Sequence, residues 1–318
     1  MRAIRFHNHG GPDVLTLEEV DTPEPGPGEV RIDAEAIGVN PVDTYFREGE
    51  YPVPDRPFVP GSDVAGTVAA VGQGVTDLSV GDRVYATGLG NGRPGTYAES
   101  CIAPADFVAP LPESVSEVDG AALSLVGMTA WQVFVHHAGV EPAETVLVHG
   151  GSGGVGHVAV QLAKTMGARV VTTASETYHD RLADLGADVT IDYHADDLEE
   201  RIVAAGEPAV ILDTFIDEYL QTNANVAAQN ARIVGIGNRT EQASFDAIGA
   251  AKGKELSYQF MTMYNTQDKH EVLSRLAALA DRGEVLPEVH RTYDLADAAD
   301  AQRAVMDESF LGKLVLEP

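Results

Sequence analysis

The stretch VLVHGGSGGVGHVAVQLAKTMGARVVTTAS, residues 146–175, decides the fold of this chain. An apolar run at 146–148 leads directly into a glycine-rich turn, which opens an amphipathic helix and is followed by a second apolar run. Glycines either permit a tight turn or let the backbone approach a ligand closely. The pattern Gly151-x-Gly153-x-x-Gly156 lies between a predicted strand and a predicted helix, which is the context that a dinucleotide fingerprint requires. We therefore predict a βαβ unit whose turn binds a dinucleotide rather than a purely structural turn.

The chemistry of this turn follows from its backbone. The N–H groups at the start of a helix have no partner within the helix, and together with the helix dipole they attract a pyrophosphate. We expect the contacts with the cofactor to come from Gly151, Ser152, Gly153, Gly154, Val155 and Gly156.

The end of the second predicted strand indicates which dinucleotide binds. NAD sites usually carry Asp or Glu there to bind the ribose 2′-OH, whereas this chain has Ala174 and Ser175. A small neutral pair leaves room for a 2′-phosphate, so NADPH is predicted over NADH. Besides Ser175, the residues expected near that phosphate are Tyr178, Arg181 and Tyr193. Glu176 and the absence of a nearby lysine argue the other way, and NADH stays open as an alternative.

Length and composition suit an α/β protein with two domains. The chain has 318 residues, 44% of them hydrophobic, and 32 glycines. No apolar run approaches the roughly 20 residues that span a bilayer, and MRAIRFHNHGG at the N-terminus resembles a first strand rather than a signal sequence. A single cysteine, Cys101, excludes an internal disulfide framework. We expect a cytoplasmic protein without membrane insertion.

The charge is strongly acidic. Forty-nine acidic residues against 21 basic ones give a net charge of −28, and only five of the basic residues are lysines. Such a surface repels nucleic acid and anionic membranes. Dispersed acidity with few lysines is typical of halophilic proteins, because concentrated salt screens the self-repulsion over a Debye length of about 3 Å at 1 M. An ordinary acidic surface is the alternative.

The order of predicted elements gives the architecture. Residues 1–120 alternate short β-like runs with Gly and Pro, which predicts a compact, mainly antiparallel β domain. From about residue 118, helices and strands alternate up to the strand RIVGIG at 232–237, which predicts a doubly wound parallel sheet. We place the Rossmann domain at 125–265, inserted between 1–124 and 266–318, which together form the β-rich domain.

The chain resembles the zinc-independent quinone oxidoreductases, the zeta-crystallin-like branch of the medium-chain dehydrogenase/reductase superfamily. The resemblance runs nearly end to end. The segments that carry it are GVNPVDTYFREGEYP (38–52), VPGSDVAGTVAAVG (59–72), GDRVYA (81–86), GTYAES (95–100), GMTAW (127–131), the glycine turn and GKLVL (312–316). It implies a GroES-like fold for the β-rich domain, with the active cleft between that domain and the Rossmann domain.

The same comparison argues against a metal. Zinc-dependent relatives carry cysteine where this chain has Asn40, and Gly-His-Glu where it has Gly61-Ser62-Asp63. A catalytic zinc needs about three protein ligands of Cys, His or acidic type, so we expect none here.

The resemblance also implies a site. Asn40, Tyr45 and Tyr51 would face the nicotinamide and orient the acceptor, since amide and phenol donors stabilise the charge that builds on its oxygen. Thr129, Gly237, Asn238 and Lys313 would contact the cofactor. The implied activity is NADPH-dependent reduction of a quinone or a related α,β-unsaturated carbonyl by a homodimer. Two alternatives stay open: an enoyl-thioester or alkenal reductase, and a cofactor-binding protein with a structural or regulatory role and little turnover.

Overall fold

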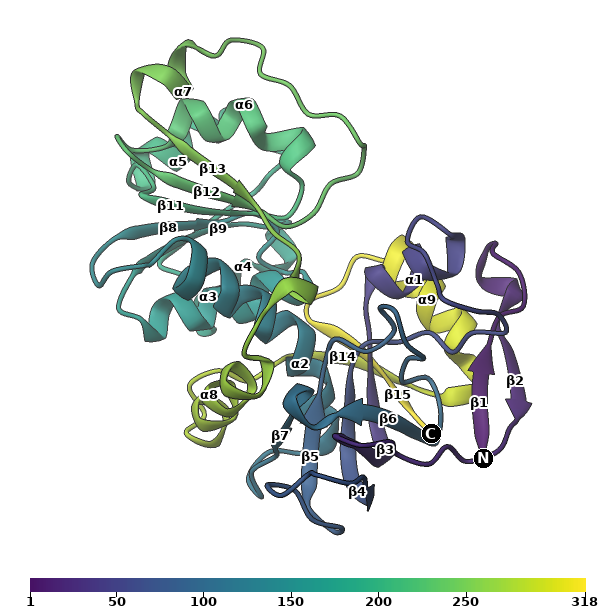
Figure 1. The fold of residues 1–318 in the computed structure, drawn as a ribbon. Helices are drawn as coiled ribbons and strands as arrows, with labels where there is room; N and C mark the ends of the chain where they lie inside the picture. The colour runs from purple at the N-terminus through teal and green to yellow at the C-terminus, as the bar shows by residue number, and fades with distance from the viewer. The chain divides into compact units, whose positions relative to one another are not determined.

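The computed structural model describes all 318 residues, and the chain divides into two compact units (Figure 1). The first unit is discontinuous and consists of Met1–Met128 and Thr266–Pro318. The second unit is the single segment Thr129–Asn265. The chain therefore leaves the first unit once and returns to it.

The first unit is built on a mainly antiparallel sheet with the strand order β14-β15-β3-β4-β5-β7, to which β6 adds by pairing with β3. A separate hairpin pairs β1 with β2. The strands are β1 (Arg2–Arg5), β2 (Thr16–Glu19), β3 (Glu29–Val39), β4 (Val64–Val71), β5 (Arg83–Ala86), β6 (Ser100–Pro104), β7 (Val108–Pro110), β14 (Val289–Asp294) and β15 (Lys313–Glu317).

The two ends of the sequence meet in this sheet. β15, at the C-terminus, pairs antiparallel with β3, and Leu314 lies opposite Val39. Apolar side chains from both segments share one core cluster, in which Ile37 and Val39 pack with Leu314 and Leu316. This pairing explains why the last stretch of the chain belongs with the first. The helices of the unit are α1 (Pro41–Glu48), α8 (Lys269–Asp281), α9 (Ala298–Asp307) and most of α2 (Glu117–Trp131).

The second unit is a parallel sheet with helices, as the alternation of elements predicted. Its strand order is β10-β9-β8-β11-β12-β13, with every neighbouring pair parallel. The order turns back between β8 and β11, and such a switch point is where open α/β sheets bind ligands. The strands are β8 (Thr145–Val148), β9 (Arg169–Thr173), β10 (Val189–Ile191), β11 (Val210–Asp213), β12 (Arg232–Gly235) and β13 (Ser257–Phe260). The helices are α3 (Gly154–Thr165), α4 (His179–Asp184), α5 (Leu198–Ala205), α6 (Ile216–Val226) and α7 (Gly249–Gly253).

These findings confirm the predicted fold class, a Rossmann sheet joined to a GroES-like β-rich domain, but several elements are additional to the prediction, among them β13, β14, α1 and α7. The sequence analysis ended the parallel sheet at the strand we expected over 232–237, whereas β13 adds an edge strand beyond it. β13 is short and nowhere fully buried, so its sequence lacks the apolar run of the inner strands. Helix α1 was also not predicted. It has only eight residues, four of them buried, and begins at a proline.

One helical stretch, Glu117–His137, is long and apolar enough to cross a membrane by length and composition. It consists of α2 and a π-helical turn, Gln132–His137. However, 78% of its apolar window is buried inside the protein. Its apolarity on all sides is therefore that of a core helix.

Candidate functional site

The glycine turn joins β8 to α3 in the second unit. Gly153 is the N-cap of α3, and the turn is tied to the end of β9 because the N–H of Gly151 donates to the carbonyl oxygen of Thr173 at 2.8 Å. The first intrahelical bond runs from the N–H of His157 to the carbonyl of Gly153 at 3.1 Å. The amides at the start of α3 therefore have no helical acceptor of their own and are available to an anion.

The three glycines of the fingerprint differ in the space around them. A Cβ atom on Gly151 would lie 2.1 Å from Thr172 Oγ1, and one on Gly156 would lie 2.1 Å from the carbonyl oxygen of Gly150. At Gly153 the nearest atom would be that same oxygen at 3.3 Å, with nothing else within 4 Å. Gly151 and Gly156 are thus required by packing, whereas Gly153 keeps one side of the turn free. This is the division of roles that a bound pyrophosphate requires.

The residues predicted for the adenosine end lie after β9 and β10. Ser175 follows β9, and its Oγ donates to the hydroxyl oxygen of Tyr193 at 3.3 Å. The two strand ends are held together by a bond from the N–H of Ala174 to the carbonyl of Ile191 at 3.0 Å. Tyr178 precedes α4, and Arg181 within it lies 3.7 Å from Asp184. The structure thus brings Ser175 and Tyr193 together.

The remaining predicted cofactor residues of this unit lie in two places. Gly237 follows β12, and a Cβ atom there would lie 2.5 Å from the carbonyl oxygen of Thr214, so only glycine fits. Asn238 donates from Nδ2 to the carbonyl of Thr240 at 3.0 Å. Thr129 is buried in the last turn of α2.

A buried polar chain, which the sequence analysis missed, supports the glycine turn. The N–H of Gly150 donates to Thr173 Oγ1 at 3.2 Å, and that hydroxyl lies 3.3 Å from His149 Nδ1. His149 Nε2 lies 2.9 Å from Asn223 Oδ1, and Asn223 Nδ2 donates to Asp213 Oδ2 at 2.5 Å. Since the Asn223 amide must give its hydrogen to the carboxylate, its oxygen faces His149, which therefore carries its proton on Nε2.

Burial shifts the pKa values of the titratable groups in this hydrogen-bond network. Burial lowers the pKa of His149, which favours the neutral ring, and it raises the pKa of Asp213. The imidazole also stacks on Tyr219, with ring centroids 4.2 Å apart. The sequence offered only an isolated histidine after a strand, because its partners come from β9, β11 and α6, far along the chain.

The residues predicted for the acceptor lie in the first unit, where Asn40 is the centre of a buried cluster. Lys313 Nζ donates to Asn40 Oδ1 at 2.5 Å and to the carbonyl of Val39 at 2.6 Å. Asn40 Nδ2 donates to Asp63 Oδ2 at 2.8 Å, and the backbone N–H of Asn40 donates to Asp43 Oδ2 at 3.0 Å. Asn40, Asp43, Asp63 and Lys313 are each no more than 3% exposed.

This geometry gives Lys313 a different setting from the one that the resemblance implied. Its ammonium is bonded within the first unit to residues 39 and 40 rather than open to a ligand. The amide of Asn40 is similarly engaged on both sides. Of the predicted acceptor residues, Tyr45 and Tyr51 keep accessible side chains. Tyr51 is 43% exposed, and its ring meets that of Tyr45 edge-on with centroids 5.9 Å apart.

Burial dominates the protonation of this cluster. It raises the pKa of Asp63 to about 6 and that of Asp43 to about 7, although Lys313 opposes both shifts. Burial also lowers the pKa of Lys313, against the attraction of the two carboxylates. With two carboxyl groups and one ammonium out of contact with water, the cluster takes up a proton near neutral pH. Burial, followed by the charge of Glu50, raises the pKa of Tyr45, so this phenol stays neutral and able to donate.

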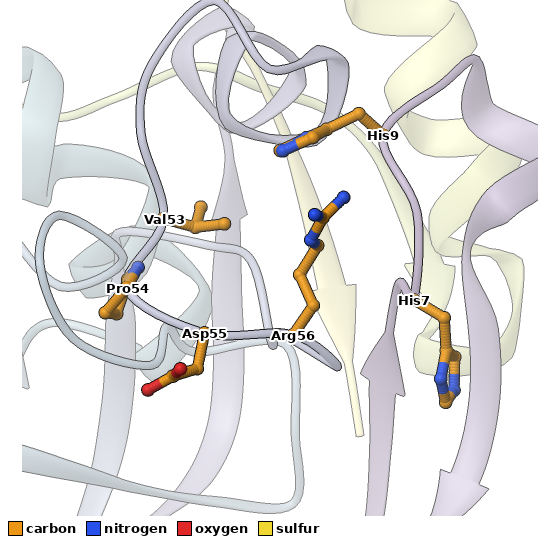
Figure 2. Close-up of a pocket in the computed structure, with 6 residues that line it drawn as sticks. All are labelled: His7, His9, Val53, Pro54, Asp55 and Arg56. Atoms are coloured by element: carbon orange, nitrogen blue, oxygen red, sulfur yellow. The ribbon is translucent and has the colours of Figure 1, made fainter.

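A surface pocket of about 430 Å³ lies elsewhere in the first unit, lined by His7, His9, Val53, Pro54, Asp55 and Arg56. Figure 2 shows the guanidinium of Arg56 extending toward the ring of His9, while the carboxylate of Asp55 points the other way. None of the predicted site residues lines this pocket.

Comparison with known proteins places the chain. Residues 26–113 match the alcohol dehydrogenase GroES-like domain, and residues 185–316 match the zinc-binding dehydrogenase family. A quinone oxidoreductase of Pseudomonas aeruginosa is 33% identical, with 100% of this chain and 99% of the relative covered. The crystal structure of Escherichia coli quinone oxidoreductase complexed with NADPH is 29% identical and has a TM-score of 0.90, with both chains covered in full. The crystal structure of an NAD-dependent alcohol dehydrogenase is 31% identical and has a TM-score of 0.93, again with full coverage of both chains.

A GroES-like domain joined to a Rossmann sheet with a glycine-rich first turn defines a medium-chain dehydrogenase/reductase. Within that superfamily, the chain belongs to the quinone oxidoreductase family.

The residues present do not fit the zinc implied by one of the matched family names. No group of three or more His, Cys, Asp or Glu side chains gathers anywhere in the structure to hold a metal ion. Asn40 and Ser62, which the resemblance sets at zinc-ligand positions, carry an amide and a hydroxyl instead of the thiol, imidazole or carboxylate that zinc requires, and the ammonium of Lys313 lies against Asn40. A metal cation next to Asn40 would be repelled by the ammonium of Lys313, which is already hydrogen-bonded there.

The unequal space at the glycines predicts unequal stability effects. Gly156→Ala forces a side chain against backbone and should lower the free energy of unfolding by about 1–3 kcal/mol. Gly153→Ala should change it by less than about 1 kcal/mol, because the backbone there is extended (φ −69°, ψ 171°) and suits any residue. Urea unfolding of the two variants checks this. Equal losses would contradict the assigned roles.

The raised carboxyl pKa values predict a pH effect on stability. Between about pH 4 and 7 the folded protein keeps a proton on Asp43 that the unfolded chain has released, so this group makes the free energy of unfolding fall as pH rises through that window. The slope is at most about 1.4 kcal/mol per pH unit per proton. Asp43→Asn should flatten the slope, measured by urea unfolding from pH 4.5 to 7.5. Asp307→Asn, at an exposed acid, is the control and should keep the wild-type slope.

Proposed function

We propose that the protein reduces a quinone with NADPH: the quinone, NADPH and a proton give the hydroquinone and NADP⁺. The full-length similarity to quinone oxidoreductases supports this reaction, and so does the relative solved with NADPH. The observation in this chain that carries the cofactor choice is Ser175, a small neutral residue bonded to Tyr193 where an NAD site usually has a carboxylate. Bound NADPH supplies the hydride.

The second unit carries the groups proposed to bind the cofactor. The free side of the turn at Gly153 and the amides of Ser152, Gly154, Val155 and Gly156 suit the pyrophosphate, while the N–H of Gly153 donates within the turn to the carbonyl of Gly150 at 3.0 Å. The hydroxyls of Ser175 and Tyr193 are proposed donors to the 2′-phosphate, flanked by Tyr178 and Arg181. For the nicotinamide end the proposed contacts are Thr129, Gly237 and Asn238.

The first unit carries the groups proposed to orient the acceptor. Hydride transfer to a quinone places negative charge on a carbonyl oxygen, and a neutral phenol stabilises that charge by donating a hydrogen bond. Tyr45 is the proposed donor, because its raised pKa keeps its proton in place. Tyr51, in edge contact with Tyr45, is proposed to cover the acceptor ring. Asn40 is proposed to support these tyrosines rather than to contact the acceptor, since its amide is already hydrogen-bonded to Lys313 and Asp63.

The proposed reaction uses no zinc, because the residues around Asn40 do not form a metal site. A related α,β-unsaturated carbonyl would accept a hydride by the same chemistry. Coenzyme A thioesters are less suited, since a chain with 21 basic residues against 49 acidic ones offers little attraction to their phosphates. The homodimer, the cytoplasmic location and the adaptation to high salt stay predictions.

The reaction can be tested by following NADPH and NADH absorbance in molar potassium chloride with a panel of quinones and short alkenals. We expect oxidation that depends on a quinone, with NADPH preferred. The variant Gly153→Val should abolish turnover while the protein stays folded, because its side chain enters the space proposed for the pyrophosphate.

Other results would redirect the assignment. Oxidation with alkenals alone would make the protein an enone reductase. NADPH binding without oxidation by any acceptor would leave a cofactor-binding protein without the proposed activity. Normal turnover by Gly153→Val would contradict the proposed position of the cofactor.

The proposed role of Tyr45 predicts a selective loss. Tyr45→Phe removes the hydroxyl but keeps the ring contact, and it should lower kcat for the quinone by about 10- to 100-fold while NADPH affinity is retained. Steady-state kinetics and NADPH titration measure the two effects. Tyr293→Phe is the control, since that hydroxyl contacts Arg291 on the strand β14. A wild-type kcat in Tyr45→Phe would exclude the phenol as the donor.

A further inference from the structure

The buried cluster at Asn40 is connected to both proposed acceptor tyrosines. Asn40 is the N-cap of α1, where the carboxylate of Asp43 binds its backbone N–H. Tyr45 lies one turn further along α1. The carbonyl of Tyr45 accepts hydrogen bonds from the N–H groups of Gly49, Glu50 and Tyr51, at 3.1, 3.0 and 3.3 Å. The start of α1 therefore determines where Tyr45 and Tyr51 lie.

Lys313 holds that start from the other end of the sequence. β15 places its ammonium against two successive residues, the carbonyl of Val39 at the end of β3 and the side chain of Asn40. A lysine has only donors and a carboxylate only acceptors, so Lys313 and Asp63 together admit a single orientation of the Asn40 amide. Both the oxygen and the nitrogen of the Asn40 side-chain amide, at the N-cap of α1, are thus fixed.

The charge of Lys313 is as important as its hydrogen bonds. Asp43 and Asp63 are completely buried, and Lys313 is the cation that lies with them. A buried carboxylate without a compensating cation is strongly unfavourable and takes up a proton. Without the ammonium, Asp43 would be protonated to a greater extent and would lose negative charge at the start of α1, where an anion is stabilised by the helix dipole.

We propose that Lys313 is a positioning residue, which acts through Asn40 and the Asp43–Asp63 pair to set the start of α1 and thereby the positions of Tyr45 and Tyr51. This inference rests on the proposed function in so far as those tyrosines orient the acceptor. It assigns Lys313 to the acceptor side of the reaction instead of the cofactor.

The test uses Lys313→Met, with Lys269→Met as a matched control. Lys269 is also buried in the first unit, where its Nζ donates to the carbonyl of Thr266 at 2.6 Å and lies 4.6 Å from the centre of the Phe107 ring. A third protein, Lys313→Met with Asp63→Asn, removes one charge of each sign and restores the balance. Because it leaves no additional unpaired charge, it carries the test if Lys313→Met alone does not fold.

Two measurements are made on each protein: amide hydrogen exchange over residues 41–51, and the kinetics of quinone reduction together with NADPH affinity. For Lys313→Met we expect faster exchange over 41–51, a loss of at least about tenfold in kcat/KM for the quinone, and unchanged NADPH affinity. The charge-balanced double variant should recover part of both losses, and Lys269→Met should show neither.

Each other result has a defined meaning. Weaker NADPH binding by Lys313→Met, with unchanged exchange over 41–51, would overturn the proposal and make Lys313 a cofactor ligand. Equal effects in Lys269→Met, or no recovery in the double variant, would reduce Lys313 to general stability and also overturn it. A further outcome is that exchange responds as expected while none of the acceptors tested supports NADPH oxidation by the wild-type protein. In that case the positioning role of Lys313 at α1 stands and the proposed function fails.

Discussion

The buried ammonium of Lys313 is the constraint on which the first unit depends. It lies at the start of the last strand, yet it bonds to the end of β3 and to the cap of α1, more than 270 residues earlier. Two carboxyl groups are buried in the same cluster, and neither would be tolerated there without a nearby cation or a proton. The C-terminal segment is therefore tied to the N-terminal sheet both by strand pairing and by a charge that would be unfavourable elsewhere in the core.

The second unit holds its glycine turn with buried hydrogen bonds and without a buried ammonium. Its glycine turn must stay open for a ligand, so it cannot be held by side chains of its own. A network of hydrogen bonds from Gly150 through Thr173, His149 and Asn223 to Asp213 anchors the turn to the neighbouring strands and to α6. A neutral histidine with both nitrogens engaged suits this place, because each side chain of the network is buried and each has a partner. The rigidity of the turn thus comes from three strands and a helix.

Much of the fold was predictable because it depends on local patterns. The alternation of short strand-like runs with helical segments marked the strands from β8 to β12, and the space around Gly151 and Gly156 explains why those positions are glycine. The prediction was incomplete where the local signal was weak. The edge strand β13 lacks a buried apolar run, and α1 is a short helix with polar residues on its buried face, including Asp43 and Arg47. The fully buried Arg47 has two guanidinium nitrogens for which the structure supplies no partner.

The sequence by itself determined the class of fold, the glycine turn and the neutral residues after β9, since each is a property of a few neighbouring residues. Only the tertiary structure decided what Asn40, His149 and Lys313 contact. Apart from Asp43, which lies three residues from Asn40, their side-chain partners are 23 to 274 residues away along the chain, as for Asn40 with Asp63 and Lys313 with Val39. Hydrogen bonds and charge compensation act over a few ångströms in space, so no spacing along the chain reveals them until the strands are paired.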